Sequence, residues 1–126
     1  MHMIGKLERP YIDKLRGLAP CLGFVVDETP KYADGHYNPD LVCKKGDRTV
    51  GFEVEYGDVD GKKIVGDAFW LCRTFDVGFI QVINPRCFGR FKKLIKYLRD
   101  DFKRKVYVIS SDLEETRRIL ASLPES

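Results

Sequence analysis

The stretch NPDLVCKKGDRTVGFEVEYG, residues 38–57, decides the fold that the sequence predicts. Two runs rich in apolar and β-branched residues, 39–44 and 49–56, flank the tetrapeptide Lys-Gly-Asp-Arg. A glycine at the first central position of such a connection favours a two-residue type II′ turn. The stretch is therefore predicted to be a β-hairpin with Gly46 and Asp47 at its tip.

The turn also predicts which residues face each other. Lys45 faces Arg48, and counting back along both strands sets Asp40 opposite Glu53. Opposed residues of antiparallel strands point to the same face with their Cβ atoms ~4.5–5.5 Å apart, and Glu55, two residues on, shares that face. The reverse face is wholly apolar and consists of Leu41, Cys43, Val50, Phe52 and Val54. Three carboxylates are thus expected side by side on a sheet whose other face packs on a helix.

Three like charges so close together repel one another unless something neutralises them. A hard divalent cation does this, and Mg²⁺ characteristically binds one or two carboxylates together with phosphate oxygens. Such a metal lowers the pKa of a bound water and stabilises charge on a phosphate. The pattern therefore predicts Asp40, Glu53 and Glu55 as ligands of Mg²⁺, with Mn²⁺ as a substitute. The alternative for each residue taken singly is a solvated acidic side chain at a strand end.

The rest of the chain alternates helices and strands. Apolar residues at helical spacing predict helices at residues 9–19, 60–75, 88–102 and 112–123. Short apolar runs predict further strands at residues 21–27, 77–83 and 105–110. The order is α-β-β-β-α-β followed by α-β-α. With 126 residues, of which 44% are hydrophobic and 33% charged, the chain is expected to be one α/β domain over residues 3–126.

Composition narrows the partners and the compartment. The net charge is only +3, but nine basic residues fall between Arg86 and Lys105. The four cysteines are scattered without zinc-site spacing, which favours a reducing, cytoplasmic location. No stretch approaches the ~18 apolar residues of a membrane span, so no membrane partner is expected.

The Asn-Pro-Asp tripeptide ending at Asp40, the hairpin, and the Glu-Val-Glu tripeptide from Glu53 to Glu55 resemble the motif of the PD-(D/E)XK, restriction-endonuclease-like superfamily. The α-β-β-β-α-β order over roughly residues 9–83 is similar to that superfamily's common core. Glu55 stands where the usual lysine is, giving ExE, a variation similar to that of restriction enzymes of the BamHI and BglII type. The resemblance implies a central mixed sheet flanked by helices, extended at the C-terminus by α-β-α.

By this resemblance Asp40 and Glu53 are metal ligands, and Glu55 is a further ligand or the group that orients or deprotonates the attacking water. The implied activity is a Mg²⁺-dependent endonuclease that hydrolyses phosphodiester bonds in DNA. Few residues remain outside the core to read base edges, so a structure-specific or weakly sequence-specific enzyme is expected. Cutting both strands needs two active sites, which favours a homodimer.

Three alternatives stay open at this point. A non-catalytic member of the same fold would bind DNA or assemble subunits without hydrolysis. A nucleotide-binding α/β domain is disfavoured, because no glycine-rich phosphate loop follows any predicted strand. A protein-interaction module would leave the three carboxylates individually dispensable.

Two lysines and a histidine are candidates near the motif. Lys62 and Lys63 open the helix after the acidic strand, and either could supply the missing lysine. The alternatives are a solvated first-turn lysine for each and, for Lys63, an i,i+4 ion pair with Asp67. His36, in the loop before the motif, is a candidate phosphate contact or an uninvolved loop residue.

The predicted helix at 88–102 carries an outward ridge of basic side chains. Its members that are candidates for nucleic-acid binding are Lys92, Lys93, Lys96 and Arg99. Such a ridge can track a phosphate backbone without reading bases. The alternative is an ordinary solvated helix face.

Overall fold

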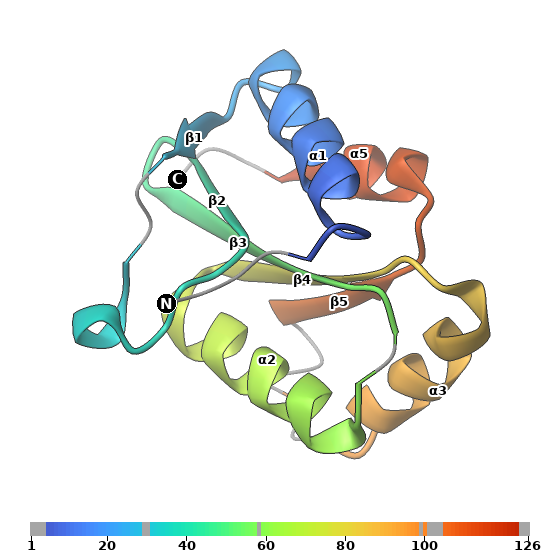
Figure 1. Cartoon of the computed structure of the whole chain (residues 1–126). Helices are drawn as coiled ribbons and strands as arrows, with labels where there is room; N and C mark the ends of the chain where they lie inside the picture. Colours follow the sequence, from blue (N-terminus) through green and yellow to red (C-terminus); the bar gives the residue numbers. More distant parts are fainter. Residues whose placement is uncertain (1–4, 29–30, 58, 99, 101–104, 124–126) are drawn as a thin grey trace.

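A five-stranded mixed sheet with helices on both faces makes up the α/β architecture of the chain in a computed structural model, which describes residues 5–28, 31–57, 59–98, 100 and 105–123 (Figure 1). The strands are β1 (Val25–Asp27), β2 (Leu41–Lys45), β3 (Arg48–Glu55), β4 (Val77–Val82) and β5 (Val106–Ile109). In the described residues the helices are α1 (Arg9–Cys21), α2 (Gly61–Thr74), α3 (Pro85–Ile95) and α5 (Leu113–Ser122), with a short 3₁₀ turn, η1 (Ala33–Gly35).

The hairpin of β2 and β3 has the predicted register. Lys45 pairs with Arg48 and Leu41 with Phe52, and the Asp40 N–H donates to the Phe52 carbonyl at 3.1 Å. Gly46 has a φ of 62°, as the first central residue of a type II′ turn requires. Along the paired residues 41–45 and 48–52 the alternation is regular, so their faces are those that the sequence predicts. The Asp40 N–H lies one residue out of this register, and the predicted Asp40–Glu53 pair is not part of the ladder.

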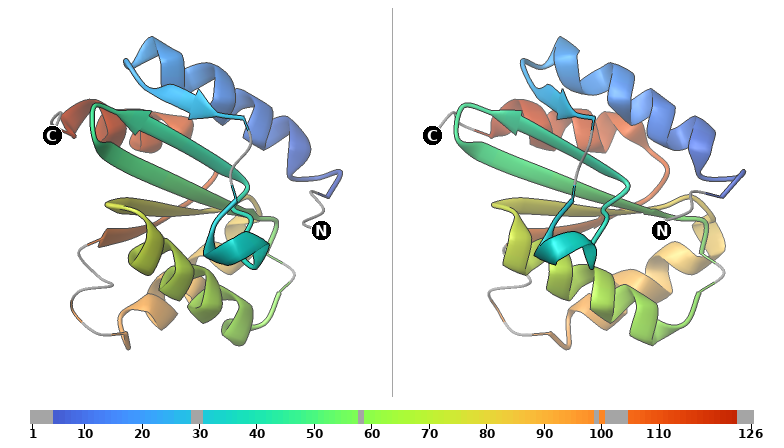
Figure 2. Two further views of the ribbon diagram at one scale, coloured as in Figure 1. Left: turned by 90° about the vertical axis from the view of Figure 1, so that its left-hand side faces the viewer. Right: turned by 60° about the vertical axis from the view of Figure 1, so that its left-hand side comes forward.

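The strand order β1-β2-β3-β4-β5 combines two patterns of pairing. The first three strands form an antiparallel meander, and β4 and β5 run parallel to β3. Parallel neighbours need a crossover, and two crossovers of the same hand proceeding in one direction place their helices on one face. Accordingly α2 and α3 cover one face of the sheet and α1 and α5 the other (Figures 1 and 2).

Two apolar clusters fill the space on the two sides of the sheet. The reverse face of the hairpin packs against α1 and α5, through residues such as Ile12, Leu15 and Leu120, as the sequence predicts. Phe52 stacks on Phe79 of β4 with ring centroids 4.9 Å apart. The other cluster joins the sheet to α2 and α3.

Two paired glycines bring α2 close to the sheet. Gly51 of β3 lies beside Gly78 of β4. A Cβ atom would lie 2.2 Å from the ring of Phe75 at the first position and 2.6 Å from Leu71 at the second. Because neither position has room for a side chain, the helix can approach the same face that carries Glu53 and Glu55.

The first helix is longer than predicted. It was expected to stop before Pro20, yet it continues to Cys21. Gly23, with φ of 86°, then ends it: the Phe24 N–H bonds to the Ala19 carbonyl and the Gly23 N–H to the Pro20 carbonyl. This is a Schellman ending, in which glycine takes the left-handed conformation. Consequently β1 begins only at Val25, four residues later than predicted.

The basic helix differs from its prediction at both ends. Asn84 caps it by accepting from the Arg86 N–H, and Pro85 occupies the first turn, so α3 begins before Phe88. It ends at Ile95, because i→i−3 bonds such as Leu98 N–H to the Ile95 carbonyl tighten the chain there. The predicted single helix at 88–102 is therefore wrong at residues 96–98, which form a turn, and residues 99, 101 and 102 of the prediction lie outside the described residues.

No helix in the described part of the chain is long and apolar enough to cross a membrane.

Candidate functional site

Four carboxylates gather between β3 and α2. Asp40, Glu53 and Glu55 are the predicted three, and Asp67 joins them from the helix. Their exposed fractions are 9, 4, 8 and 5% in the order Asp40, Glu53, Glu55 and Asp67. Isolated buried charges are costly, so four carboxylates in one place need compensation from their surroundings.

Lys63 provides part of that compensation. Its Nζ donates to Glu55 Oε1 at 3.0 Å and to Asp67 Oδ1 at 2.7 Å. The i,i+4 contact with Asp67 is therefore present, and the lysine reaches the acidic strand as well. Asp60 caps α2 by accepting from the Lys63 N–H at 3.0 Å, which fixes where the helix starts. Lys62, its neighbour, is exposed.

Asp40 is tied to the neighbouring strand. Its Oδ2 accepts from the backbone N–H of Val54 at 2.7 Å. A carboxylate held this way has a fixed position near Glu53, and its negative charge repels that of Glu53. The Asp40 side chain thus braces the end of the hairpin and adds negative charge to the cluster.

The like charges raise the pKa values of two members. Burial raises the pKa of Glu53 well above its usual value, and the charges of Asp40, Asp67 and Glu55 raise it further against the opposing effect of Lys63. Burial likewise raises the pKa of Asp67 to about 7, with the charge of Glu55 adding to it and Lys63 opposing it. The cluster is short of positive charge, so its buried acids tend to keep a proton.

Lys63 stays protonated in this arrangement. Burial lowers its pKa, but the hydrogen bonds and charges of Asp67 and Glu55 outweigh that effect and the pKa is raised overall. A lysine of this kind acts as a cation or a proton donor and not as a general base.

Two buried polar atoms of the described residues have no hydrogen-bond partner, Tyr37 Oη and Asp67 Oδ2. Burial and then the Glu53 charge raise the pKa of Tyr37, but its hydroxyl does not meet the carboxylate in hydrogen-bond geometry. Buried polar groups are nearly always paired, so both atoms call for an explanation.

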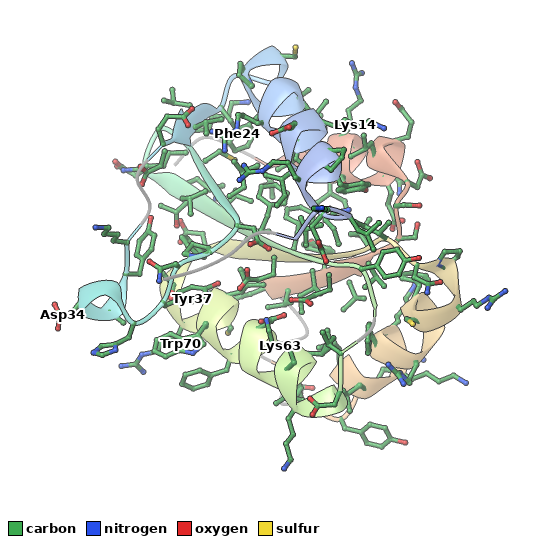
Figure 3. The ribbon with its side chains drawn as sticks, viewed as in Figure 1. Lys14, Phe24, Asp34, Tyr37, Lys63 and Trp70 are labelled. Carbon is green, nitrogen blue, oxygen red and sulfur yellow. The ribbon has the colours of Figure 1, made fainter. Side chains whose placement is uncertain are left out.

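An open pocket of about 560 Å³ lies over this cluster. Its lining comes from the loop 35–38, from Glu53, and from the α2 residues Lys62, Lys63, Gly66, Asp67 and Trp70. Tyr37 stacks on Trp70 with centroids 5.2 Å apart and planes 17° from parallel, and the two rings lie side by side in Figure 3. The pocket therefore has an aromatic wall and an acidic floor.

The loop that carries Tyr37 is closed on itself. The N–H of Tyr32 bonds to the Tyr37 carbonyl at 3.0 Å, and the N–H of Tyr37 bonds back to the Tyr32 carbonyl at 3.1 Å. Within it Ala33 and Asp34 have φ of 51° and 56°. Left-handed residues other than glycine cost about 1 kcal/mol or more each and cluster at binding sites. This strained loop holds Tyr37 against Trp70 of α2, and His36 lines the pocket beside it.

The predicted nucleic-acid residues divide into two places. His36 is exposed and lines the pocket with Lys62 and Lys63. Lys92 and Lys93 on α3 and Lys96 at its C-cap are exposed. The helix α3 lies on the other side of α2 from η1 (Figure 1). No α3 residue is among the described residues that line the pocket. Arg99 lies outside the described residues.

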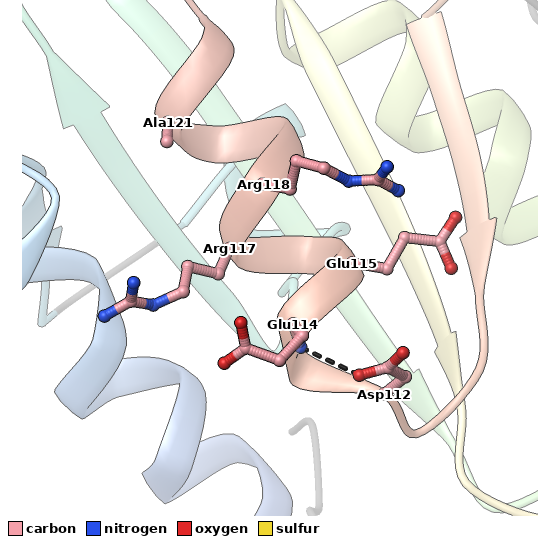
Figure 4. A pocket seen from close by; sticks show the side chains of 6 residues that line it. All are labelled: Asp112, Glu114, Glu115, Arg117, Arg118 and Ala121. Atoms are coloured by element: carbon pink, nitrogen blue, oxygen red, sulfur yellow. Dashed lines mark hydrogen bonds between the residues drawn. The ribbon is translucent and has the colours of Figure 1, made fainter.

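A second concavity, of about 490 Å³, follows α5. Figure 4 shows that its lining side chains all belong to this helix and its N-cap, Asp112, and that they fan outward. Asp112 accepts from the Glu114 N–H at 2.9 Å, which is ordinary helix capping. With acids and arginines mixed on one exposed helix, this surface does not converge on any point.

In the described residues, no three Asp, Glu, His or Cys side chains are arranged as a ready-made metal site. The carboxylate oxygens are nevertheless the donor type that Mg²⁺ and Mn²⁺ prefer. The buried excess of negative charge and the unpaired Asp67 Oδ2 fit the chemistry of a divalent cation, whereas Lys63 now bridges two of the candidate ligands.

Sequence reasoning missed three members of this site. Asp67 was regarded only as a partner of Lys63, and Gly66 and Trp70 were not singled out. The available signal was helical spacing, since positions 63, 67 and 70 recur on one face of a helix. The position of the loop 35–38 across from that face had no such signal.

No family model matches the chain, and comparisons with curated proteins and with solved structures gave no significant match either.

Proposed function

We propose that this protein is a Mg²⁺-dependent endonuclease that hydrolyses phosphodiester bonds in DNA, with its site between β3 and α2. The observation that carries the proposal is the set of four buried carboxylates around one lysine, beside a pocket open to solvent. A fold rarely keeps such an unfavourable cluster without a functional reason.

A restriction-endonuclease-like core is part of this proposal. The meander β1-β2-β3, the crossover helix α2 and the parallel strand β4 follow α1 in the order that the superfamily motif implies. The charge of Asp40 also acts on Glu53, which supports the nearness of these two residues that the motif implies. Through α3, β5 and α5 the chain would then extend that core at its C-terminal end.

Asp40, Glu53 and Glu55 would hold the cation. When bound, the metal lowers the pKa of a water and stabilises charge on the phosphate oxygens. The chain itself positions these ligands: the Val54 N–H orients Asp40, and Lys63 orients Glu55. Cation binding needs Lys63 to release at least one of its two carboxylates. The Lys63 side chain is half exposed, so it is able to turn toward a phosphate.

Hydrolysis then requires one proton acceptor and one proton donor. The water oxygen forms a bond to phosphorus, the bond from phosphorus to the leaving oxygen breaks, and a proton passes from the water to the leaving alcohol. Asp67, whose Oδ2 is unpaired beside the proposed ligands, would accept the proton. Lys63, which stays protonated, can donate to a phosphate oxygen or the leaving group.

A non-catalytic, DNA-binding member of the same fold is the second candidate. It is favoured by one observation: Lys63 already bridges Glu55 and Asp67, and no ready-made set of three metal ligands exists in the described residues. In that case the ion pair would be permanent and the carboxylates would serve structure alone.

Supercoiled plasmid and a branched DNA, each with Mg²⁺, Mn²⁺ or EDTA, separate these candidates. The wild type is expected to cut with either metal, and both Glu53→Gln and the Asp40→Ala/Glu53→Ala double variant should fall to the EDTA level. A Glu114→Gln/Glu115→Gln variant removes two carboxylates from α5 and should cut normally. Absence of cutting by a folded wild type would overturn the proposal in favour of the non-catalytic candidate. Cutting that survives in both site variants would show that the nuclease lies elsewhere.

Cleavage of both strands by one such site per chain favours a two-fold homodimer. Sedimentation with and without DNA tests that expectation. A strictly monomeric protein that makes only nicks would contradict it.

A further inference from the structure

The face of α2 that borders the pocket carries an aromatic ring, a glycine and charged side chains. Lys63, Gly66, Asp67 and Trp70 follow one another along it, so that an aromatic ring stands at one end and the acidic cluster at the other. Tyr37 stacks on one face of Trp70, and Phe69 meets the Trp70 ring edge-on, with centroids 5.5 Å apart. A ring held by two neighbours in this way is a rigid stacking surface.

Gly66 leaves the middle of that helix face without a side chain. Glycine inside a helix costs about 1 kcal/mol relative to alanine, and such a cost needs a reason. At Gly66 no packing reason exists, because a Cβ atom would meet nothing within 4 Å. The residue lines the pocket, so its missing side chain widens the space between Lys63 and Trp70.

Two of the residues that line the pocket carry an unpaired buried atom. These atoms are Tyr37 Oη, from the loop, and Asp67 Oδ2, from α2. A hydroxyl and a carboxylate oxygen can together accept from and donate to the polar edge of one planar ligand. At the rim, Lys62 and His36 offer donors to an anionic group.

We infer that this pocket binds one unpaired nucleotide of DNA, with its base against Trp70 and its phosphate toward Lys62 and Lys63. The inference rests on the proposed function, because it takes the neighbouring carboxylates as the hydrolytic site. A base inside a duplex has its faces covered by its neighbours and cannot enter, whereas every unpaired base has a free face. The preferred substrates are therefore single-stranded tails, flaps and open junctions, cut beside the unpaired nucleotide.

Trp70 reports directly on this binding, because it is the one tryptophan in the chain. A short oligothymidylate and a blunt hairpin duplex of equal length are titrated in EDTA, where cleavage is blocked, while tryptophan emission is followed. The oligothymidylate is expected to quench the emission and to bind about tenfold more tightly to the pocket than the duplex does.

Matched glycine variants test the shape of the pocket. Gly66→Ala should weaken oligothymidylate binding about tenfold, because its methyl group enters the space for the base. Gly89→Ala makes the same change inside α3, where a Cβ atom also meets nothing within 4 Å, and should leave binding unchanged. Both chains are expected to fold, since neither methyl group meets a neighbour.

Ring variants test the stacking surface through the anisotropy of a labelled oligothymidylate. Trp70→Leu should weaken binding about tenfold or more, and Trp70→Phe should retain part of it. Unchanged affinity in both Gly66→Ala and Trp70→Leu, or equal quenching by the duplex, would overturn the inference.

The cleavage assay keeps the two proposals apart. Quenching by the oligothymidylate without any cutting would leave the nucleotide pocket and remove the hydrolytic function. Metal-dependent cutting of a blunt duplex as fast as a tailed one, without quenching, would leave the nuclease and remove the pocket.

Discussion

The two faces of the sheet treat buried polar groups in opposite ways. Toward α1 and α5, Gln81 is fully buried, yet both ends of its amide are paired. Its Nε2 donates to Tyr11 Oη at 3.1 Å and to the Ser110 carbonyl at 3.2 Å, and its Oε1 accepts from Thr116 Oγ1 at 2.8 Å. This network links β4 to α1 and α5 and leaves nothing on the amide unsatisfied.

Toward α2, the buried polar groups are crowded and incompletely paired. Glu53 has carboxylates for neighbours, and Asp67 Oδ2 and Tyr37 Oη have no hydrogen-bond partner among the described residues. This face is open to solvent through a pocket that several elements line. The contrast separates polar residues that stabilise the fold from polar residues that destabilise it. Substitutions in the two groups should therefore change the free energy of unfolding in opposite directions.

The largest expected effect is on the satisfied face. Gln81→Ala should lower the free energy of unfolding by about 3 kcal/mol, because it removes the partner of the Thr116 hydroxyl and one partner each of Tyr11 Oη and the Ser110 carbonyl, and it opens a cavity. Urea denaturation measures the loss. A cost below about 1 kcal/mol would mean that the network contributes little and would weaken the comparison.

Glu53→Gln should act in the opposite direction. The pKa of Glu53 is raised in the folded state, so folding is favoured below its unfolded pKa and loses stability as pH rises above it. Glutamine keeps the shape without that pH dependence. The variant should therefore be about 2 kcal/mol more stable than the wild type near pH 8, with the gain fading toward about pH 4. Destabilisation at both pH values would show that the charge of Glu53 is well compensated.

Asp67 sharpens the comparison by its pH range. Its pKa rises from 3.8 to about 7 on folding, so its share of stability is complete below about pH 4 and is lost as pH climbs to about 7. Asp67→Asn removes this titration and should therefore flatten the pH profile of unfolding over that window. The expected change is only about 1 kcal/mol, because the substitution also removes a charged partner of Lys63. Denaturation curves of both chains between about pH 4 and pH 8 supply the test, and parallel profiles would contradict it.

The smallest expected effect is at Gly66. Gly66→Ala should raise the free energy of unfolding by about 0.5–1 kcal/mol, as alanine does inside a helix, while weakening nucleotide binding. Gly89→Ala should give a similar gain without the binding loss. A destabilising Gly66→Ala would show that packing, and not a ligand, requires the glycine.

Much of the fold follows from local patterns in the sequence. The Gly46-Asp47 turn fixes the hairpin register, and the register sets the three carboxylates on one face and the apolar core on the other. The helices α2 and α5 begin at the residues after Asp60 and Asp112, whose side chains cap them. These features depend on near neighbours, which is why the sequence predicts them.

Other features depend on structure that is distant along the chain. The helix ends at Cys21 and Ile95 are set by closing hydrogen bonds and by packing, and the apolar pattern runs past both. The site likewise needs the close approach of α2 to Gly51 and Gly78 and the placement of the loop 35–38. No local spacing shows that a helix will lie near enough for Asp67 to join the hairpin's carboxylates.

The central claim, that the α2 face holds a divalent-cation site, is tested most directly by thermal unfolding with and without Mg²⁺ near pH 8. A ligand that binds only the folded state stabilises it by about 2.7 kcal/mol at a hundred times its Kd. The wild type and the Glu114→Gln/Glu115→Gln control should therefore melt at a clearly higher temperature with saturating Mg²⁺, and Glu53→Gln should not respond. An unchanged melting temperature in the wild type, or an equal rise in Glu53→Gln, would contradict the account.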